Sequence, residues 1–346
     1  MSVSARALRS WSIAIGGMGF LDAMHVLVAA HISGTHSHAT TGWAAFCLAH
    51  PWLIALPVFG YSYAWVRFVR RSDQLAWGIA GFALLWLVVR IWTTAYATGH
   101  QDFIQGGAAM LGWLLGAVWA RALGLRPSRS PEERLEVDRY AGTGALAVFA
   151  ATYVCAGTSK LLNTGFEWTG AVTIRLMAIS HLRVDDTSSL TGLKTWLAHN
   201  SYAGTVLQWA TVIVQLGAVT ILFGRRARLV WCLALALLHV GIYLSSGIVF
   251  LTPMVIALAF AIPWDRRRGA GARGAESRGA EPPAHGEPPP LGEPPPLGEP
   301  PALDPVRVRR VLLAAGAGLV LVLSLVWLTP LGPALRFQLQ PWQVAR

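Results

Sequence analysis

Apolar stretches long enough to cross a lipid bilayer recur along this chain. A transmembrane helix needs about 20 predominantly apolar residues. Hydrophobic residues make up 54% of the chain and charged residues only 13%, a balance typical of membrane proteins. The sequence therefore predicts an all-α, polytopic helical membrane protein in a lipid bilayer. We expect nine transmembrane helices, at residues 12–30, 48–69, 75–96, 104–121, 141–162, 203–223, 228–246, 248–264 and 309–329.

The positions of the basic residues predict the orientation of these helices. If the N-terminus is cytoplasmic, 21 of the 28 Lys and Arg residues lie at cytoplasmic ends, and the other seven lie outside or in the outer halves of spans. Cytoplasmic loops of membrane proteins are enriched in Lys and Arg. We therefore expect a cytoplasmic N-terminus and an outer C-terminus, in the bacterial cytoplasmic membrane. Nucleic-acid binding is not expected, because the arginines are spread over several loops and do not form one face.

The chain divides into three parts. Residues 1–264 form the predicted transmembrane domain, and residues 307–346 hold the last span and a short outer tail. Between them, residues 265–306 are rich in Arg and Gly and then in Pro, with Gly-Glu-Pro-Pro-Pro-Leu repeated. Such a composition cannot bury a core, so we predict a disordered, extended cytoplasmic linker. It is either a bare spacer or a ligand for a proline-reading domain.

Two further segments affect the topology. Residues 163–200 lie outside in this arrangement and are expected to form interfacial helices. Lys194, within this segment, is expected to lie in a loop. Thr252-Pro253 interrupts the eighth span, which leaves a re-entrant segment as an alternative to a crossing helix.

Ionisable side chains concentrate in the outer halves of the predicted spans. Lys160 ends the fifth span, His239 lies beyond the middle of the seventh, and Arg90 lies near the end of the third. Tyr243 follows His239 by four residues and so shares its helix face. Polar groups in hydrocarbon cost several kcal/mol unless they face a wet or protein-lined cavity. We therefore predict a shared cavity that opens to the outer face.

Each of these residues also has a purely structural interpretation. The Lys160 ammonium could reach the outer lipid headgroups, His239 could be a neutral core imidazole, and Arg90 could pair with Asp102. A cluster of histidines at His31, His36, His38 and His50 suggests a metal-binding loop, but it lacks Cys or carboxylate ligands. We favour a solvated loop and predict no metal site.

One segment carries a resemblance to a known family. The run Tyr153-Val154-Cys155-Ala156-Gly157-Thr158-Ser159-Lys160-Leu161, followed by Trp168-Thr169-Gly170, resembles part of the vitamin-K-dependent gamma-carboxylase and of the related bacterial HTTM (horizontally transferred transmembrane) proteins. In that family an Ala-Gly-x-x-Lys-Leu run ends a span. Gly99-His100-Gln101 and Leu238-His239 are similar to two further family positions. The resemblance covers about residues 75–264.

The resemblance implies an activity and a set of site residues. In the family reaction a lysine amine deprotonates reduced vitamin K, oxygen adds to the anion, and the epoxidised product takes a proton from a glutamate side chain, which then captures carbon dioxide. Lys160 would be the base, in neutral form, with His100 and His239 in the active site. Arg90, Trp168 and Tyr243 are the expected substrate-binding residues, and the implied cofactor is a reduced quinone such as vitamin K hydroquinone.

Two classes of function follow. The first is a membrane enzyme, a carboxylase/epoxidase-like lyase that acts on a quinone-like or lipid-soluble substrate. The second is a non-catalytic membrane protein, such as an export, immunity or maturation partner, in which the same fold only packs and binds. The peptide or protein partner is left open in both. Convergence of Lys160, His100 and His239 on one pocket would favour the enzyme.

Overall fold

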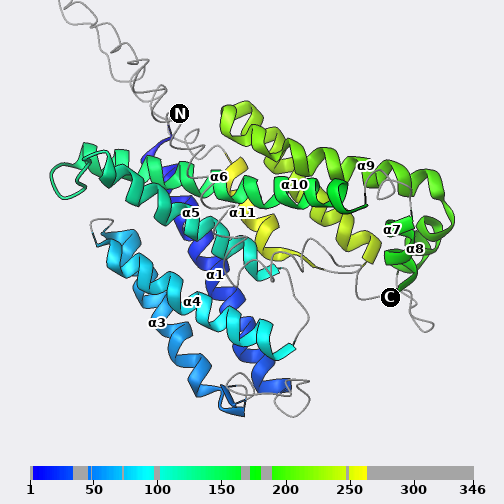
Figure 1. The fold of residues 1–346 in the computed structure, drawn as a ribbon, viewed down its shortest axis with the longest axis horizontal. Helices are drawn as coiled ribbons and strands as arrows, with labels where there is room; N and C mark the ends of the chain where they lie inside the picture. The colour runs from blue at the N-terminus through cyan, green and yellow to red at the C-terminus, as the bar shows by residue number, and fades with distance from the viewer. Residues whose placement is uncertain are drawn as a thin grey trace, which may run out of the picture.

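The computed structural model describes residues 3–33, 46–47, 49–71, 74–96, 102–164, 172–180, 189–246 and 249–262. These residues are all-helical and contain no strand. The named helices are α1 (Ala5–Ser33), α3 (Trp52–Arg70), α4 (Leu75–Tyr96), α5 (Asp102–Ala122), α6 (Pro131–Thr164), α7 (Val172–Ser180), α8 (Ser189–His199), α9 (Ser201–Gly217), the 3₁₀ helix η2 (Ala218–Phe223), α10 (Arg225–Ser246) and α11 (Leu251–Ala261) (Figure 1).

Five of the described helical segments are long and apolar enough to cross a membrane. They are Ala5–Val28, Trp52–Arg70, Pro131–Leu162, Ser201–Phe223 and Arg225–Ser246. This agrees with an integral membrane protein, although it is fewer than the nine spans predicted. Shorter apolar helices occupy Leu75–Ile91 and Leu251–Ala261. The ninth predicted span and the predicted linker at 265–306 lie outside the described residues.

The eighth predicted span corresponds to α11, which is shorter than expected. Its 11 residues extend about 16 Å at 1.5 Å per residue, about half of the ~30 Å hydrocarbon core. Pro253 lies in the first turn of α11, where a missing backbone N–H costs no intrahelical hydrogen bond. The proline therefore lies at the start of this helix and does not interrupt it.

Helix α1 lies at the centre of the bundle. It contacts α3, α4, α5, α6 and α11, and in Figure 1 it runs between the α3–α4 pair and the α6–α9–α10 group. Two buried aromatic side chains of α3 tie that helix to α1. The Tyr61 hydroxyl donates to the Gly16 carbonyl at 2.8 Å, and Trp65 Nε1 donates to the Ser12 carbonyl at 3.3 Å. A Cβ at Gly16 would lie 2.1 Å from the Trp65 indole, so glycine is needed for this close approach.

Helices α5 and α6 make a close backbone contact at their glycines. A Cβ built at Gly112 would lie 2.3 Å from the Gly144 carbonyl oxygen, and one at Gly116 would lie 2.2 Å from the Tyr140 carbonyl oxygen. Gly112 and Gly116 are four residues apart and share one helix face. Small residues at this spacing let two membrane helices approach closely, and this pairing positions α6 in the bundle.

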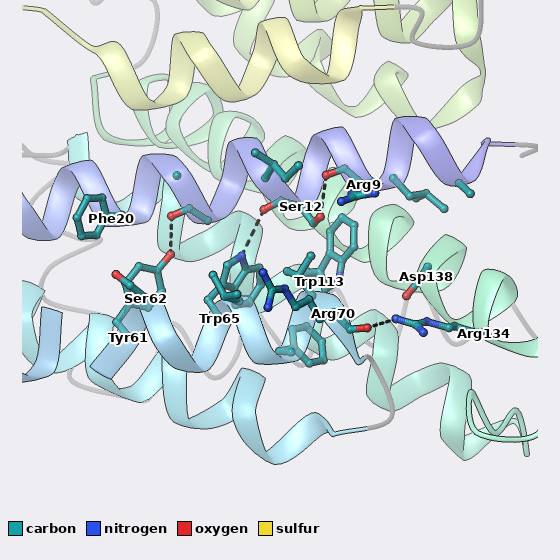
Figure 2. A pocket seen from close by; sticks show the side chains of 18 residues that line it. Arg9, Ser12, Phe20, Tyr61, Ser62, Trp65, Arg70, Trp113, Arg134 and Asp138 are labelled. Atoms are coloured by element: carbon teal, nitrogen blue, oxygen red, sulfur yellow. Dashed lines mark hydrogen bonds between the residues drawn. The ribbon is translucent and has the colours of Figure 1, made fainter. Parts of the chain in front are cut away.

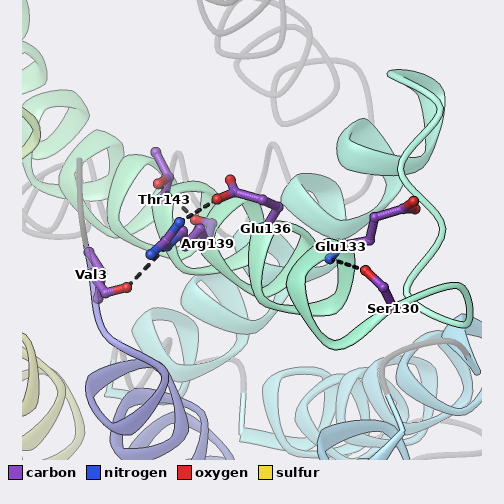
Figure 3. Close-up of polar contacts among 6 residues, drawn as sticks. All are labelled: Val3, Ser130, Glu133, Glu136, Arg139 and Thr143. Atoms are coloured by element: carbon purple, nitrogen blue, oxygen red, sulfur yellow. Dashed lines mark hydrogen bonds and ion pairs between the residues drawn. The ribbon is translucent and has the colours of Figure 1, made fainter. Parts of the chain in front are cut away.

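The arginine-bearing helix ends lie together at one end of the bundle. The Arg134 guanidinium, near the start of α6, donates to the Arg70 carbonyl at the end of α3. Arg139 Nε donates to the Val3 carbonyl just before α1 at 3.2 Å, and the same guanidinium pairs with Glu136 (Figure 3). The Arg228 guanidinium of α10 lies 5.0 Å from the Trp11 ring centroid. We call this end of the bundle the basic end.

The start of α6 has a side-chain cap. The Glu133 backbone N–H donates to the Ser130 hydroxyl at 3.1 Å (Figure 3), and Pro131 occupies the first helical position. The Glu133 carboxylate in turn accepts the Arg126 backbone N–H at 2.7 Å. An N-cap serine, a proline at the first position and acidic residues in the first turn all favour a helix start here. The helix therefore begins ten residues before the predicted apolar span.

Candidate functional site

A buried tyrosine and a buried histidine form a hydrogen bond between α6 and α10. The Tyr153 hydroxyl lies 2.6 Å from His239 Nε2. Tyr153 is 4% exposed and His239 6% exposed, so this polar contact is shielded from its surroundings. The two residues are 86 positions apart in sequence. Tyr153 begins the segment that resembles the HTTM and carboxylase family, and the contact joins this segment to His239, a predicted site residue.

The second nitrogen of His239 differs from the first in having no partner among the described residues. Nδ1 is buried and makes no hydrogen bond within the described residues. If the tyrosine hydroxyl donates to Nε2, a neutral imidazole carries its proton on Nδ1. A buried donor without a partner costs about 1–3 kcal/mol. A bound molecule with a carbonyl or hydroxyl oxygen would satisfy this nitrogen.

Aromatic rings surround the pair. The Phe250 ring, just before α11, lies 5.3 Å from the His239 ring, and Phe149 lies 5.2 Å from Tyr153 on the other side. Phe149 continues to Phe260 and then to Trp11, with centroid separations of 5.5 and 5.0 Å. The polar groups within these rings are the Tyr153 phenol, the His239 imidazole and the buried indole N–H of Trp11. Such surroundings suit an aromatic, lipid-soluble ligand.

Lys160 lies on the same face of α6 as Tyr153. The two are seven residues apart, which is close to two helical turns and about 10 Å along the axis. Lys160 is half-buried, and its ammonium group lies 3.4 Å from the Ala156 carbonyl oxygen of its own helix. Helix α9 packs closely beside it, because a Cβ at Gly157 would lie 3.1 Å from Gln215. Ser159 and Gln215, both buried, add polar groups to this part of the α6–α9 packing.

The remaining predicted site residues do not all join this cluster. Tyr243 follows the buried His239 by one turn but is 40% exposed. Its side chain is therefore not enclosed with His239 in the buried cluster. Arg90 is half-buried on α4. His100 and Trp168 lie outside the described residues. Of the three predicted catalytic residues, the structure therefore places Lys160 and His239, on α6 and α10.

The expectation that Lys194 lies in a loop was wrong. Lys194 lies on α8 and is only 5% exposed. Helices α7 and α8 pack against each other, and α10 contacts both of them. The Arg175 Nε of α7 donates to the Ala198 carbonyl of α8 at 2.7 Å. The segment folds into two packed helices, and this packing covers the lysine that a loop would have left in solvent.

A second buried polar contact ties α11 to α1. The Thr252 hydroxyl donates to the Asp22 carboxylate at 2.5 Å, and Asp22 is 7% exposed. A Cβ at Gly106 of α5 would lie 3.1 Å from the other carboxylate oxygen. Thr252 is two residues after Phe250, so the start of α11 contacts both Asp22 and His239.

Sequence reasoning missed Tyr153 and Phe250 as site residues. For Tyr153 a signal existed, because it precedes Lys160 by seven residues and therefore shares its helix face. Phe250 carries no comparable signal. No group of three or more His, Cys, Asp or Glu side chains among the described residues is placed to hold a metal ion, and His31, His36 and His38 fall outside the described side chains.

Comparisons with protein-family models, with curated proteins and with solved structures found no match.

Proposed function

We propose that this chain is an integral membrane enzyme that binds a reduced quinone-like lipid beside Tyr153 and His239. The observation that carries the proposal is the buried 2.6 Å hydrogen bond between these side chains, together with His239 Nδ1, which has no hydrogen-bond partner among the described residues. A hydroquinone or quinone oxygen would accept from this nitrogen. Such a ligand is apolar and aromatic, so it also suits the rings of Phe149 and Phe250.

Lys160 is the proposed base of the reaction. It lies on the Tyr153 face of α6, about two turns further along. A hydroquinone carries hydroxyl groups on opposite sides of its ring, so one could bind at His239 while the other approaches Lys160. The amine would take the hydroxyl proton, and the resulting anion would react with oxygen as in the family that the sequence resembles. The resemblance to the HTTM and gamma-carboxylase family supports this role.

The proposed topology has nine spans in the bacterial cytoplasmic membrane, with the basic end in the cytoplasm. Support comes from the contacts that bring Arg134, Arg139 and Arg228 to the ends of α3 and α1. A cytoplasmic location of this end satisfies the preference of Lys and Arg for cytoplasmic loops. The end of α6 that carries Lys160 would then lie in the outer half of the membrane.

Binding and chemistry are tested separately. The protein is reconstituted in nanodiscs and titrated without oxygen with vitamin K hydroquinone, with tryptophan fluorescence as the readout. His239→Gln should weaken binding about tenfold, because a hydrogen bond from a buried donor is lost. His199→Gln is the matched control, since His199 is exposed and, within the described residues, its ring bonds to the Thr195 carbonyl of its own helix. Equal affinity of wild type and His239→Gln would contradict the proposed binding site.

The role of Lys160 is then tested by adding oxygen and following hydroquinone consumption by chromatography. Lys160→Met should retain hydroquinone binding and lose turnover, because the base is absent. Lys160→Arg should lose turnover as well, since guanidinium stays protonated at neutral pH. Turnover retained by both variants would rule out Lys160 as the base.

The alternative is a non-catalytic membrane protein. The hydrogen bond of Lys160 to the Ala156 carbonyl of its own helix and the rings on both sides of the Tyr153–His239 pair are compatible with packing alone. In that case wild-type protein would consume no hydroquinone under oxygen, and Tyr153→Phe and His239→Gln would change only stability.

A further inference from the structure

A cavity of about 740 Å³ lies between α1 and α3 at the basic end of the bundle. Figure 2 shows its lining, with Arg9, Arg70 and Arg134 at one end and Phe20, Tyr61 and Ser62 at the other. This cavity is separate from the proposed substrate site, because none of its lining residues belongs to the second half of α6 or to α10.

The polar end of the cavity carries excess positive charge. Three arginines line it, against one carboxylate, Asp138. Arg134 is held in place by its hydrogen bond to the Arg70 carbonyl. Within the described residues, the guanidinium groups of Arg9 and Arg70 make no hydrogen bond or ion pair. Two unpaired guanidinium groups at one cavity end are suited to an anion, above all to a phosphate.

The rest of the cavity is mainly apolar and adjoins exposed apolar side chains of α1 and α3. Its walls include Phe20, Trp65 and Trp113. Ile13 and Val66 also line it, and they are 60% and 46% exposed. A hydrocarbon chain could therefore enter sideways between α1 and α3. At Gly17, another lining residue, an added Cβ would meet nothing within 4 Å, so open space adjoins the backbone here.

We propose that this cavity binds an acidic phospholipid from the surrounding membrane. The headgroup phosphate is held by Arg9 and Arg70, and an acyl chain lies along Ile13, Val66 and Phe20. The charge of the polar end selects the acidic headgroup, and the apolar walls select a lipid over a soluble phosphate. The bound lipid would fill the space between α1 and α3 at the basic end. This proposal does not depend on the proposed enzymatic function.

The test is native mass spectrometry of the full chain in detergent, titrated with phosphatidylglycerol or phosphatidylcholine. Wild type should bind phosphatidylglycerol about tenfold more tightly than phosphatidylcholine, because two arginines attract the anionic headgroup. Arg9→Gln/Arg70→Gln should reduce this preference to about twofold or less. The control is Arg225→Gln/Arg226→Gln, which removes two exposed arginines that do not line the cavity and should keep the wild-type preference. Equal preference in wild type and the Arg9/Arg70 variant would overturn the proposal.

A second pair of variants tests the apolar part. Gly17→Leu should fill the cavity mouth and weaken binding of both lipids. Gly107→Leu, at another glycine with open space around it but outside the cavity, should leave binding unchanged. Soluble glycerol phosphate should not displace the lipid. Unchanged lipid binding by Gly17→Leu, or displacement by glycerol phosphate, would overturn the assignment of a lipid to this cavity.

Discussion

The Tyr153 hydroxyl and His239 Nε2 are 2.6 Å apart and join α6 to α10 within the buried part of the protein. Both groups are polar, and each satisfies the other where water is excluded. In the part of the chain that the structure describes, Nδ1 of the same imidazole has no hydrogen-bond partner. The pair therefore stabilises the packing of two helices and also offers a hydrogen-bonding group to a ligand.

Replacing Tyr153 by phenylalanine should destabilise the protein. The change leaves His239 Nε2 buried without its partner, at a cost of about 1 kcal/mol, toward the lower end of the range for such groups because hydrogen bonds in membrane proteins are often weak. Thermal unfolding in nanodiscs measures the effect. Tyr140→Phe is the control, since Tyr140 lies on the same helix and its hydroxyl has no hydrogen-bond partner within the described residues. An equal loss in both variants would mean that the Tyr153–His239 bond contributes nothing.

Thr252→Val should loosen the contact between α11 and α1. It removes a donor to the buried Asp22 carboxylate, which should cost about 1–3 kcal/mol. Thr252→Ser keeps the hydroxyl and should restore most of the stability. Thr220→Val is a control, because its hydroxyl bonds only to the Gly217 carbonyl one turn earlier. A Thr252→Ser variant as unstable as Thr252→Val would show that the hydroxyl is not the stabilising group.

The contact between α5 and α6 should not tolerate side chains at its glycines. A Cβ at Gly144 would lie 2.2 Å from the Gly112 carbonyl oxygen, which is too close for two non-bonded atoms. In Gly144→Val the two helices must therefore separate. We expect a loss of 1–3 kcal/mol or more, as for other overpacked sites. Gly107→Val, with nothing within 4 Å, should remain near wild type. Thermal unfolding of the two variants measures the difference. Equal melting temperatures for Gly144→Val and Gly107→Val would contradict the close contact between α5 and α6.

Impermeant thiol labelling of intact bacterial cells tests the orientation. The native cysteines Cys47, Cys155 and Cys232, all free, are first replaced by alanine. Ser128→Cys, exposed at the basic end, should be labelled only after cell lysis. Thr195→Cys, exposed on α8, should be labelled in intact cells. The opposite pattern would reverse the proposed topology.

The helices follow from apolar length, but their ends do not. The sequence predicts spans at 12–30, 48–69, 141–162 and 228–246, and the structure has α1, α3, α6 and α10 around them. Each helix extends beyond at least one end of its apolar stretch, by one residue at α3 and by ten at the start of α6. Capping and arginine contacts at the basic end favour these added residues. The start of α6 at Pro131 could have been found from Ser130, Pro131 and Glu133. The spacing of Gly112 and Gly116 similarly contains the signal for the contact with α6.

The candidate site was only partly predictable. His239 and Lys160 stand out as polar residues in apolar stretches, which a sequence shows directly. The partner of His239 depends on how α6 and α10 meet in space, and the sequence alone does not determine this. The burial of Lys194 likewise depends on the packing of α7 and α8, which the sequence alone does not determine. The cavity between α1 and α3 combines residues of α1, α3, α5 and α6, so its charge and shape appear only in the folded protein.

The most direct test of the central claim is photo-crosslinking with an azido-naphthoquinone in nanodiscs, with adducts mapped by mass spectrometry. The proposed site predicts adducts near Tyr153 and Phe250, removed by excess vitamin K hydroquinone and reduced in His239→Gln. Adducts spread over exposed residues such as Leu162 and Tyr202, insensitive to competitor and to His239→Gln, would show only partition into lipid. That result would contradict a quinone site at the Tyr153–His239 pair.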